Sequence, residues 1–252
     1  MVQSRVHVMR ATHSAALEAD QLAVSTSITE GGDLLCRCSY WRDTLPGFQI
    51  GFPARLLRAQ HAAEWVRGND AYIDVSSAEE LELMRSSGIP PVLVTVDTEG
   101  AATRTLWHAI GLGVGRLVVS HEREIRILSA MVQRPRRVLV DISDEYGEDL
   151  LGQVQAHLGL DIIGLRCRLC ADCVQDVDRV MGRIAGLVDR HGLIVTHLRL
   201  VVPKPQGHPP FEPYALATAI QHAHKCSYER CGLPPFAMGV SVDWQTLLAT
   251  QV

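Results

Sequence analysis

The feature that most constrains this sequence is a regular alternation of short apolar runs with longer amphipathic stretches. Eight runs have the length and composition of buried strands, at residues 48–52, 71–75, 92–96, 116–120, 138–142, 162–169, 194–202 and 235–242. Seven stretches between them have helical periodicity, at residues 55–67, 78–87, 101–111, 121–132, 148–158, 174–191 and 213–228. Strands and helices that alternate in this number predict an α/β fold, the (β/α)8 or TIM barrel.

A doubly wound open sheet is the main alternative, but such sheets rarely need eight strands. No Gly-x-Gly-x-x-Gly follows the first strand, so nothing supports a dinucleotide site. The glycine cluster at residues 111–115 falls between a helix and a strand, which is the wrong end for binding phosphate. The barrel is therefore the preferred prediction.

The predicted barrel is preceded by a short strand at residues 21–25 and a helix at residues 33–44. We expect residues 1–20 to be a poorly ordered N-terminus, because they are polar or small, and residues 21–252 to form a single barrel domain. About ten residues follow the eighth strand, which leaves room for a short final helix.

Charge and composition limit the possible partners. The chain has 24 basic and 28 acidic residues, a net charge of −4, which argues against nucleic acid and anionic membranes as partners. We find no apolar run of membrane-spanning length and no signal-peptide pattern, and seven scattered cysteines do not form a disulfide scaffold. These features predict a cytoplasmic protein. Lysine chemistry has only two candidates, Lys204 and Lys225.

In a β/α barrel, reactive groups gather where the strands end at their carboxyl side. Here those positions and the loops after them carry polar residues: Asp74, Glu80, Asp97, Glu99, His121, Asp141 and Asp144. No order of serine, histidine and acid indicates a nucleophilic triad. Lys204 lies after the seventh strand and is a weak candidate for a catalytic lysine, between Pro203 and Pro205. Lys225 falls within a helical pattern and is expected on the surface.

Four collinear stretches carry a resemblance to a known family. They are Trp41-Arg42-Asp43-Thr44-Leu45-Pro46-Gly47-Phe48 and residues 73–81, 87–91 and 163–173. In this order they resemble the ornithine decarboxylase group of fold-type III pyridoxal phosphate enzymes, which includes the antizyme inhibitors. The resemblance covers residues 20–245. It implies the alanine racemase-like N-terminal barrel of that group, without the family's C-terminal β-domain.

At the positions that hold the cofactor in that family, this sequence departs from the pattern. The first-strand lysine that forms the aldimine is replaced by Gly51, and the histidine that stacks on the ring is replaced by Arg168. The Gly-Ser-Gly turn after it reads Cys170-Ala171-Asp172, and the triple-glycine phosphate loop reads Val201-Val202-Pro203. Proline also removes a backbone donor from that loop.

Two further departures concern the ring nitrogen and the fifth strand. The glutamate that pairs with the pyridine nitrogen falls on or near Met238, and an arginine late in the fifth strand is replaced by Asp141. Of the pocket positions that can be placed, Asp74 and Glu80 are retained. The interpretation from these differences is a catalytically inactive pseudoenzyme in which no cofactor is expected.

The resemblance suggests a binding role in polyamine regulation, with antizyme or an ornithine decarboxylase-like subunit as the partner. In the family, antizyme docks around the third and fourth β/α units, which correspond here to residues 106–135. Five basic residues lie in or beside that segment: Arg104, Arg116, Arg123, Arg126 and Arg134. An acidic partner could use this surface.

Two alternatives remain open. The chain could be an active pyridoxal phosphate-dependent decarboxylase of ornithine-type amino acids, or a repurposed barrel enzyme, that uses Lys204. It could also be a truncated product with no activity.

The run Cys167-x-x-Cys170-x-x-Cys173 has a spacing that invites comparison with metal sites. Its distant partners would be His222, His224, Cys226 and Cys231. Alternation along a strand points Cys167 and Cys170 to different faces, and structural zinc prefers two separated pairs. We therefore predict buried free thiols and no metal.

Overall fold

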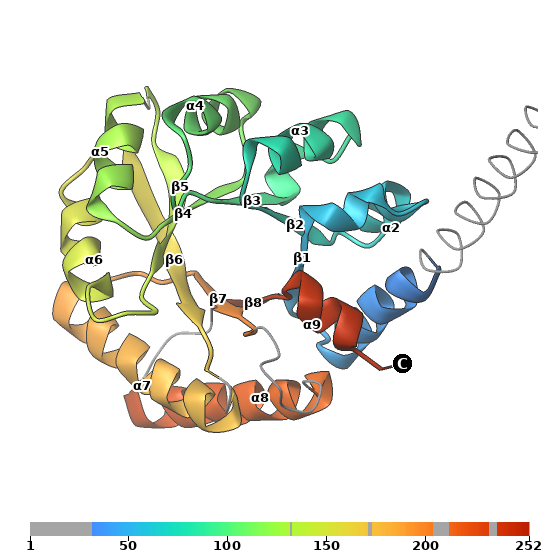
Figure 1. Cartoon of the computed structure of the whole chain (residues 1–252). Coiled ribbons are helices and arrows are strands. Elements are labelled where there is room, and N and C mark those ends of the chain that lie inside the picture. The colour runs from blue at the N-terminus through green and yellow to red at the C-terminus, as the bar shows by residue number, and fades with distance from the viewer. Residues whose placement is uncertain (1–31, 132, 171–172, 204–211, 232–235, 252) are drawn as a thin grey trace, which may run out of the picture.

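A computed structural model describes residues 32–131, 133–170, 173–203, 212–231 and 236–251. Its eight strands are β1 Gln49–Pro53, β2 Tyr72–Val75, β3 Val94–Asp97, β4 Arg116–Val119, β5 Arg136–Asp141, β6 Leu160–Arg168, β7 His197–Val201 and β8 Ala237–Ser241. Each strand pairs in parallel with the next, and β8 pairs with β1, so the sheet closes into a barrel (Figure 1). The predicted (β/α)8 fold is confirmed.

Helices alternate with these strands and lie outside the barrel (Figure 1). A helix over residues 32–44 comes first. The others are η1 Ala54–Arg58, α2 Ala62–Gly68, α3 Ala78–Ser86, η2 Pro91–Leu93, α4 Thr103–Leu112, α5 Glu122–Met131, α6 Gly147–Gln155, α7 Cys173–His191, α8 Pro213–Cys231 and α9 Trp244–Ala249. The short final helix expected after the last strand is α9. The strand expected at residues 21–25 and the N-terminus 1–20 lie outside the described residues.

Two boundaries differ from the sequence-based prediction. The helix expected at residues 55–67 is split into the 3-10 helix η1 and the α-helix α2, because His61 between them has a φ of 61°. A left-handed residue cannot continue a right-handed helix. The strand expected from Val92 begins instead at Val94, after the turn η2 that Pro91 opens.

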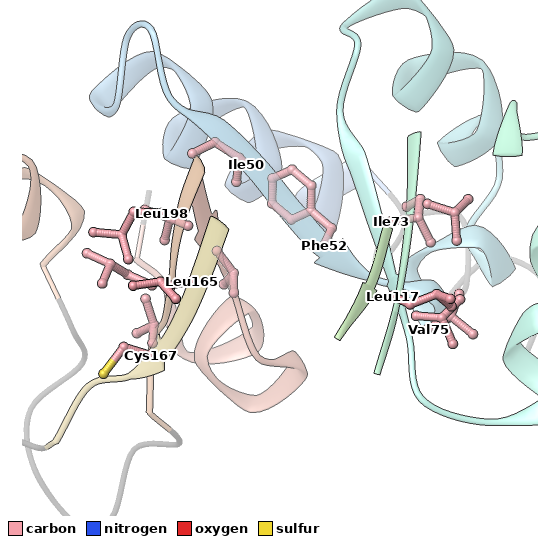
Figure 2. Packing of buried hydrophobic residues seen from close by; sticks show 14 of the residues in the cluster. Ile50, Phe52, Ile73, Val75, Leu117, Leu165, Cys167 and Leu198 are labelled. Atoms are coloured by element: carbon pink, nitrogen blue, oxygen red, sulfur yellow. The ribbon is translucent and has the colours of Figure 1, made fainter. Parts of the chain in front are cut away.

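The apolar core is a ring between the barrel and its helices. Alternate strand residues point outward into it, among them Ile50, Phe52, Ile73 and Cys167 (Figure 2). Phe52 is fully buried, and its ring meets that of Trp65 on α2 edge to face at 5.6 Å between centroids. The other strand residues point into the barrel, where the side chains are mostly polar.

Hydrogen bonds join the first and last segments of the described chain. Trp41, in the helix over residues 32–44, is fully buried, and its Nε1 donates to Thr250 Oγ1 at 2.9 Å. The guanidinium of Arg37 in the same helix donates to the Leu248 carbonyl at 2.7 Å. These bonds hold α9 beside the first helix, close to the carboxyl ends of β1 and β8. None of the described helices is long and apolar enough to cross a membrane.

Candidate functional site

Three arginines from different strands fill much of the barrel interior. Arg116 on β4, Arg166 on β6 and Arg199 on β7 are 8%, 8% and 3% exposed. Each sits at an inward position of its strand, because its neighbours in sequence belong to the outer apolar core. Charged groups buried in this way require partners, and two of the three have aspartates.

Arg166 lies between two carboxylates at the carboxyl end of the barrel. Its Nη1 is 2.7 Å from Asp97 Oδ2 and 3.3 Å from Asp141 Oδ2. Burial acts to lower the pKa of Arg166, but the charges of Asp97 and Asp141 outweigh it, and the pKa of Arg166 is raised. The arginine is therefore firmly charged. Asp97 and Asp141, both expected at strand ends, meet on one guanidinium.

Arg199 crosses the barrel to β2. Its Nη2 donates to Asp74 Oδ1 at 2.7 Å, and its Nε donates to Ser241 Oγ at 2.6 Å. A Cβ built on Gly51 would lie 1.6 Å from Arg199 Nη2 and 2.5 Å from Asp74 Oδ2. The ion pair thus occupies the space that a side chain at position 51 would need. A lysine there, as the resemblance places it, is incompatible with Arg199 in this conformation.

A cavity of about 320 Å³ opens above these ion pairs, which we call the mouth cavity. Among the described residues, its charged lining consists of Arg55, Asp74, Glu80, Asp97, Arg166, Arg199 and Asp243, in which carboxylates outnumber guanidinium groups four to three. Strands β1, β2, β3, β4, β6, β7 and β8 and the start of α9 all contribute to it. The mouth cavity is polar, charged on both signs and slightly acidic.

Asp74 and Glu80, the two retained positions, both line the mouth cavity. Glu80 also has a structural role at the start of α3. Its Oε2 accepts from the backbone N–H of Ser76 at 2.8 Å and from Ser76 Oγ at 2.9 Å, while its own N–H donates to Ser77 Oγ. This closely resembles a capping box, which fixes the first turn of a helix. Glu80 therefore shapes the wall of the cavity.

The other predicted rim residues lie elsewhere. Glu99, His121 and Asp144 line a second cavity of about 340 Å³ over β3 to β6, together with Arg168 and Cys170. Arg168, which takes the place of the stacking histidine, is on this side of the rim and 3.9 Å from Glu99. Their positions after the strand ends predicted that these groups lie at the rim of the barrel. The positions did not predict that the rim carries two separate cavities.

Of two more family positions, Met238 lies away from the mouth cavity and Val201 lies on it. Met238 belongs to the outer apolar core, 8% exposed, beside Phe236 and α8. Val201 lines the mouth cavity in place of a glycine loop. Lys204, Ala171 and Asp172 lie outside the described residues.

Burial corrects the prediction that Arg116 belongs to a docking surface. Arg116 points into the barrel and is 8% exposed, whereas Arg104, Arg123, Arg126 and Arg134 are exposed. The strand pattern at β4 alternates inward and outward, and Arg116 takes an inward position opposite Thr95.

The cysteine run divides as strand alternation predicted. Cys167 is buried in the outer core and Cys170 is exposed, so the expectation of buried thiols is right for Cys167 and wrong for Cys170. Burial raises the pKa of the Cys167 thiol to about 12. Within the described ranges, no three His, Cys, Asp or Glu side chains are grouped to hold a metal ion.

Sequence reasoning missed the Arg199–Asp74 ion pair and the packing of Arg199 on Gly51. The signal was present in part. In His197-Leu198-Arg199-Leu200 the leucines alternate with polar residues, which places Arg199 inside a barrel whose outer face is apolar. Its partner could not be read from the alternation.

The known proteins that this chain is similar to are pyridoxal-dependent decarboxylases. Residues 32–151 match the family described as pyridoxal-dependent decarboxylase, pyridoxal binding domain. A diaminopimelate decarboxylase from Actinosynnema pretiosum subsp. auranticum is 25% identical over 86% of this chain and 57% of its own length. The chain thus spans a little over half the length of this curated relative.

Solved structures agree on the fold. Lysine decarboxylase from Selenomonas ruminantium superposes with a TM-score of 0.69 at 19% identity, covering 84% of this chain and 59% of that one. Diaminopimelate decarboxylase from Helicobacter pylori, complexed with L-lysine, gives a TM-score of 0.69 at 12% identity, covering 86% and 62%.

The expectation that no cofactor belongs to this barrel is corrected by these relatives. The matched family domain is a pyridoxal-binding domain, and a related lysine decarboxylase structure contains PLP and cadaverine. In this chain, the guanidinium groups of Arg166 and Arg199 line the mouth cavity, but no lysine of the described part of the chain does. These residues do not fit a covalently attached pyridoxal phosphate, so we derive no step through it.

The matched segment and the superpositions lead to the same conclusion as the strand order. The described barrel has the fold of these decarboxylase structures, and residues 32–151 are similar to the pyridoxal-binding domain of pyridoxal-dependent decarboxylases.

Proposed function

We propose that the mouth cavity binds a basic amino acid or diamine, the ligand class of the decarboxylases that this chain resembles. The observation that carries the proposal is the charge of the lining, four carboxylates against three guanidinium groups. A basic amino acid offers one carboxylate and two ammonium groups, and a diamine offers two ammonium groups. Either ligand complements a slightly acidic cavity.

The relatives support this ligand class. Their structures include complexes with L-lysine and with cadaverine. In the mouth cavity, guanidinium groups suit a carboxylate, and Glu80, Asp97 and Asp243 suit ammonium groups. The volume of about 320 Å³ is in the range of small-molecule sites.

The test is calorimetric titration with L-lysine, L-ornithine, diaminopimelate, cadaverine and putrescine, with L-norleucine as the control that lacks a side-chain amine. The double variant Glu80→Gln, Asp243→Asn removes two charges and keeps both helix caps, because Gln and Asn also serve as capping residues. We expect its affinity for cadaverine to fall by about tenfold or more. Asp144→Asn, in the second cavity, should have no effect. Equal affinity for lysine and norleucine would refute the proposal.

We further propose that the described part of the barrel binds this ligand without catalysing its decarboxylation. The reason is the ion pair of Arg199 with Asp74, which fills the space over Gly51. The assay is release of carbon dioxide from lysine, ornithine and diaminopimelate with pyridoxal phosphate added. Turnover retained in the variant Lys204→Ala would contradict this proposal.

The second candidate function is an active pyridoxal phosphate-dependent decarboxylase of such amino acids. The match of residues 32–151 to a pyridoxal-binding domain favours it. Its amine would come from Lys204, outside the described residues. An absorbance titration with pyridoxal phosphate, followed by borohydride reduction and peptide mapping, tests it. Label on Lys204 together with turnover would establish this function in place of simple binding.

Antizyme remains a proposed partner. The exposed Arg104, Arg123 and Arg126 on α4 and α5 support an acidic partner on this face. A pull-down with antizyme is the test, and the triple variant of these arginines to glutamine should lose capture. An ornithine decarboxylase-like subunit is the other proposed partner, tested by co-purification. Capture unchanged by the triple variant would exclude this surface.

A further inference from the structure

The amino end of the barrel interior contains a buried cation without a carboxylate. Arg116 is 8% exposed, and no ion pair joins it to any carboxylate of the described part of the chain. Its Nη2 donates to Gln49 Oε1 at 2.7 Å, and its guanidinium carbon lies 4.3 Å above the Tyr72 ring. These contacts are neutral, and the charge of Asp74 acts on Arg116 more weakly than burial and the charge of Arg199 do, so the pKa of Arg116 is lowered.

A second guanidinium reaches the same space from above. Arg199 binds Asp74 and Ser241 through Nη2 and Nε, but its Nη1 is buried with no hydrogen-bond partner among the described residues. A Cβ on Gly239 would lie 3.5 Å from this Nη1. The missing side chain of Gly239 therefore leaves room beside an unused donor. Unpaired buried donors are rare in folded proteins and indicate a bound water or ion.

The space is a small cavity lined by Gln49, Arg116, Leu139, His197, Leu198, Arg199, Ala237 and Gly239. Its volume is about 10 Å³, room for a single water or small ion. In the part of the chain that the structure describes, no carboxylate lines it. The donors around it are two guanidinium groups, the Gln49 amide and the His197 ring.

We propose that this cavity binds a monatomic anion, namely chloride. The two guanidinium groups supply the charge, and the Nη1 of Arg199 supplies a donor that has no other partner. Burial and the positive charge of Arg116 lower the pKa of His197, as expected on the wall of a buried cavity with positive local charge. A bound anion would compensate Arg116 in the way that Asp74 compensates Arg199. The site is distinct from the mouth cavity, which lies on the other side of the Arg199–Asp74 ion pair.

Crystals soaked in sodium bromide and measured at the bromine absorption edge test the site directly. We expect an anomalous peak between Arg116 and Arg199. A water molecule there, with no bromide, would overturn the proposal.

Solution stability provides the second test. Chloride that binds only the folded chain raises Tm by mass action. At ten times its Kd the folding equilibrium shifts elevenfold, which corresponds to about 3–5 °C for a chain of this size. The comparison is sodium chloride against sodium gluconate at equal ionic strength. An equal Tm in both salts would overturn the proposal even if bromide binds in the crystal.

Two variants locate the effect. Arg116→Gln removes the charge that has no carboxylate in contact, and Gly239→Ala places a methyl group beside Arg199 Nη1 without changing any charge. Both should lose the chloride dependence of Tm. Arg126→Gln, on the exposed face of α5, removes a charge elsewhere and should keep it. If Gly239→Ala folds and keeps the full chloride dependence, the anion does not occupy this cavity.

Discussion

Substitution of Gly51 by alanine is the sharpest perturbation that the structure offers. The new Cβ would lie 1.6 Å from Arg199 Nη2, so the guanidinium must leave Asp74 Oδ1. Losing a partner from a buried ion pair costs about 3–5 kcal/mol. The Asp74 side chain is 27% exposed and keeps some hydration, which favours the lower end, about 3 kcal/mol. For a chain of this size, that lowers Tm by about 6–12 °C.

The assay is thermal and urea unfolding followed by circular dichroism, in a double-mutant cycle with Arg199→Ala. Without the guanidinium, the methyl group still lies 2.5 Å from Asp74 Oδ2, but that carboxylate is 27% exposed, is no longer held by Arg199 and can turn aside. We therefore expect Gly51→Ala to cost about 1 kcal/mol in that background, clearly less than with Arg199 present. Gly152→Ala is the control: it lies in α6 with nothing within 4 Å of the added Cβ, and it should stabilise the chain slightly. The reasoning is refuted if Gly51→Ala leaves Tm unchanged, or costs as much without Arg199 as with it.

Thiol reactivity should follow burial. Burial raises the pKa values of Cys38 and Cys167 to about 12, so at pH 8 both should resist iodoacetamide while exposed Cys36 is alkylated, as mass spectrometry of the folded chain would show. Rapid labelling of Cys38 would contradict this. The hydrogen bond from Arg190 lowers the pKa of Glu148. A carboxyl whose pKa is depressed in the folded state stabilises it above the unfolded pKa, and that stability is lost as the pH falls through the folded pKa. Glu148→Gln should therefore reduce the acid sensitivity of Tm below about pH 4, and an identical pH profile would show that this pair contributes nothing.

Much of the candidate site could be predicted from strand ends. Asp74, Asp97 and Asp141 were expected at the carboxyl end of the barrel, and all three lie there, because parallel strands bring their ends to one rim. The sequence analysis did not predict which side chains pair with one another, as with Arg199 and Asp74. The cofactor expectation was wrong for a related reason, since it judged each family position separately, whereas residues 32–151 taken together match a pyridoxal-binding domain.

The sequence by itself determined the fold, because apolar alternation over short runs is a local property and eight such runs between helices have few other solutions. Local backbone effects moved only the boundaries, as at His61. Tertiary structure alone decided the interior. Asp74 and Arg199 are 125 residues apart in sequence, and only closure of the barrel places their charges 2.7 Å apart over Gly51. The alternation along a strand predicts which side chains point into the barrel. Which side chain lies opposite depends on the register of the strands on the other wall.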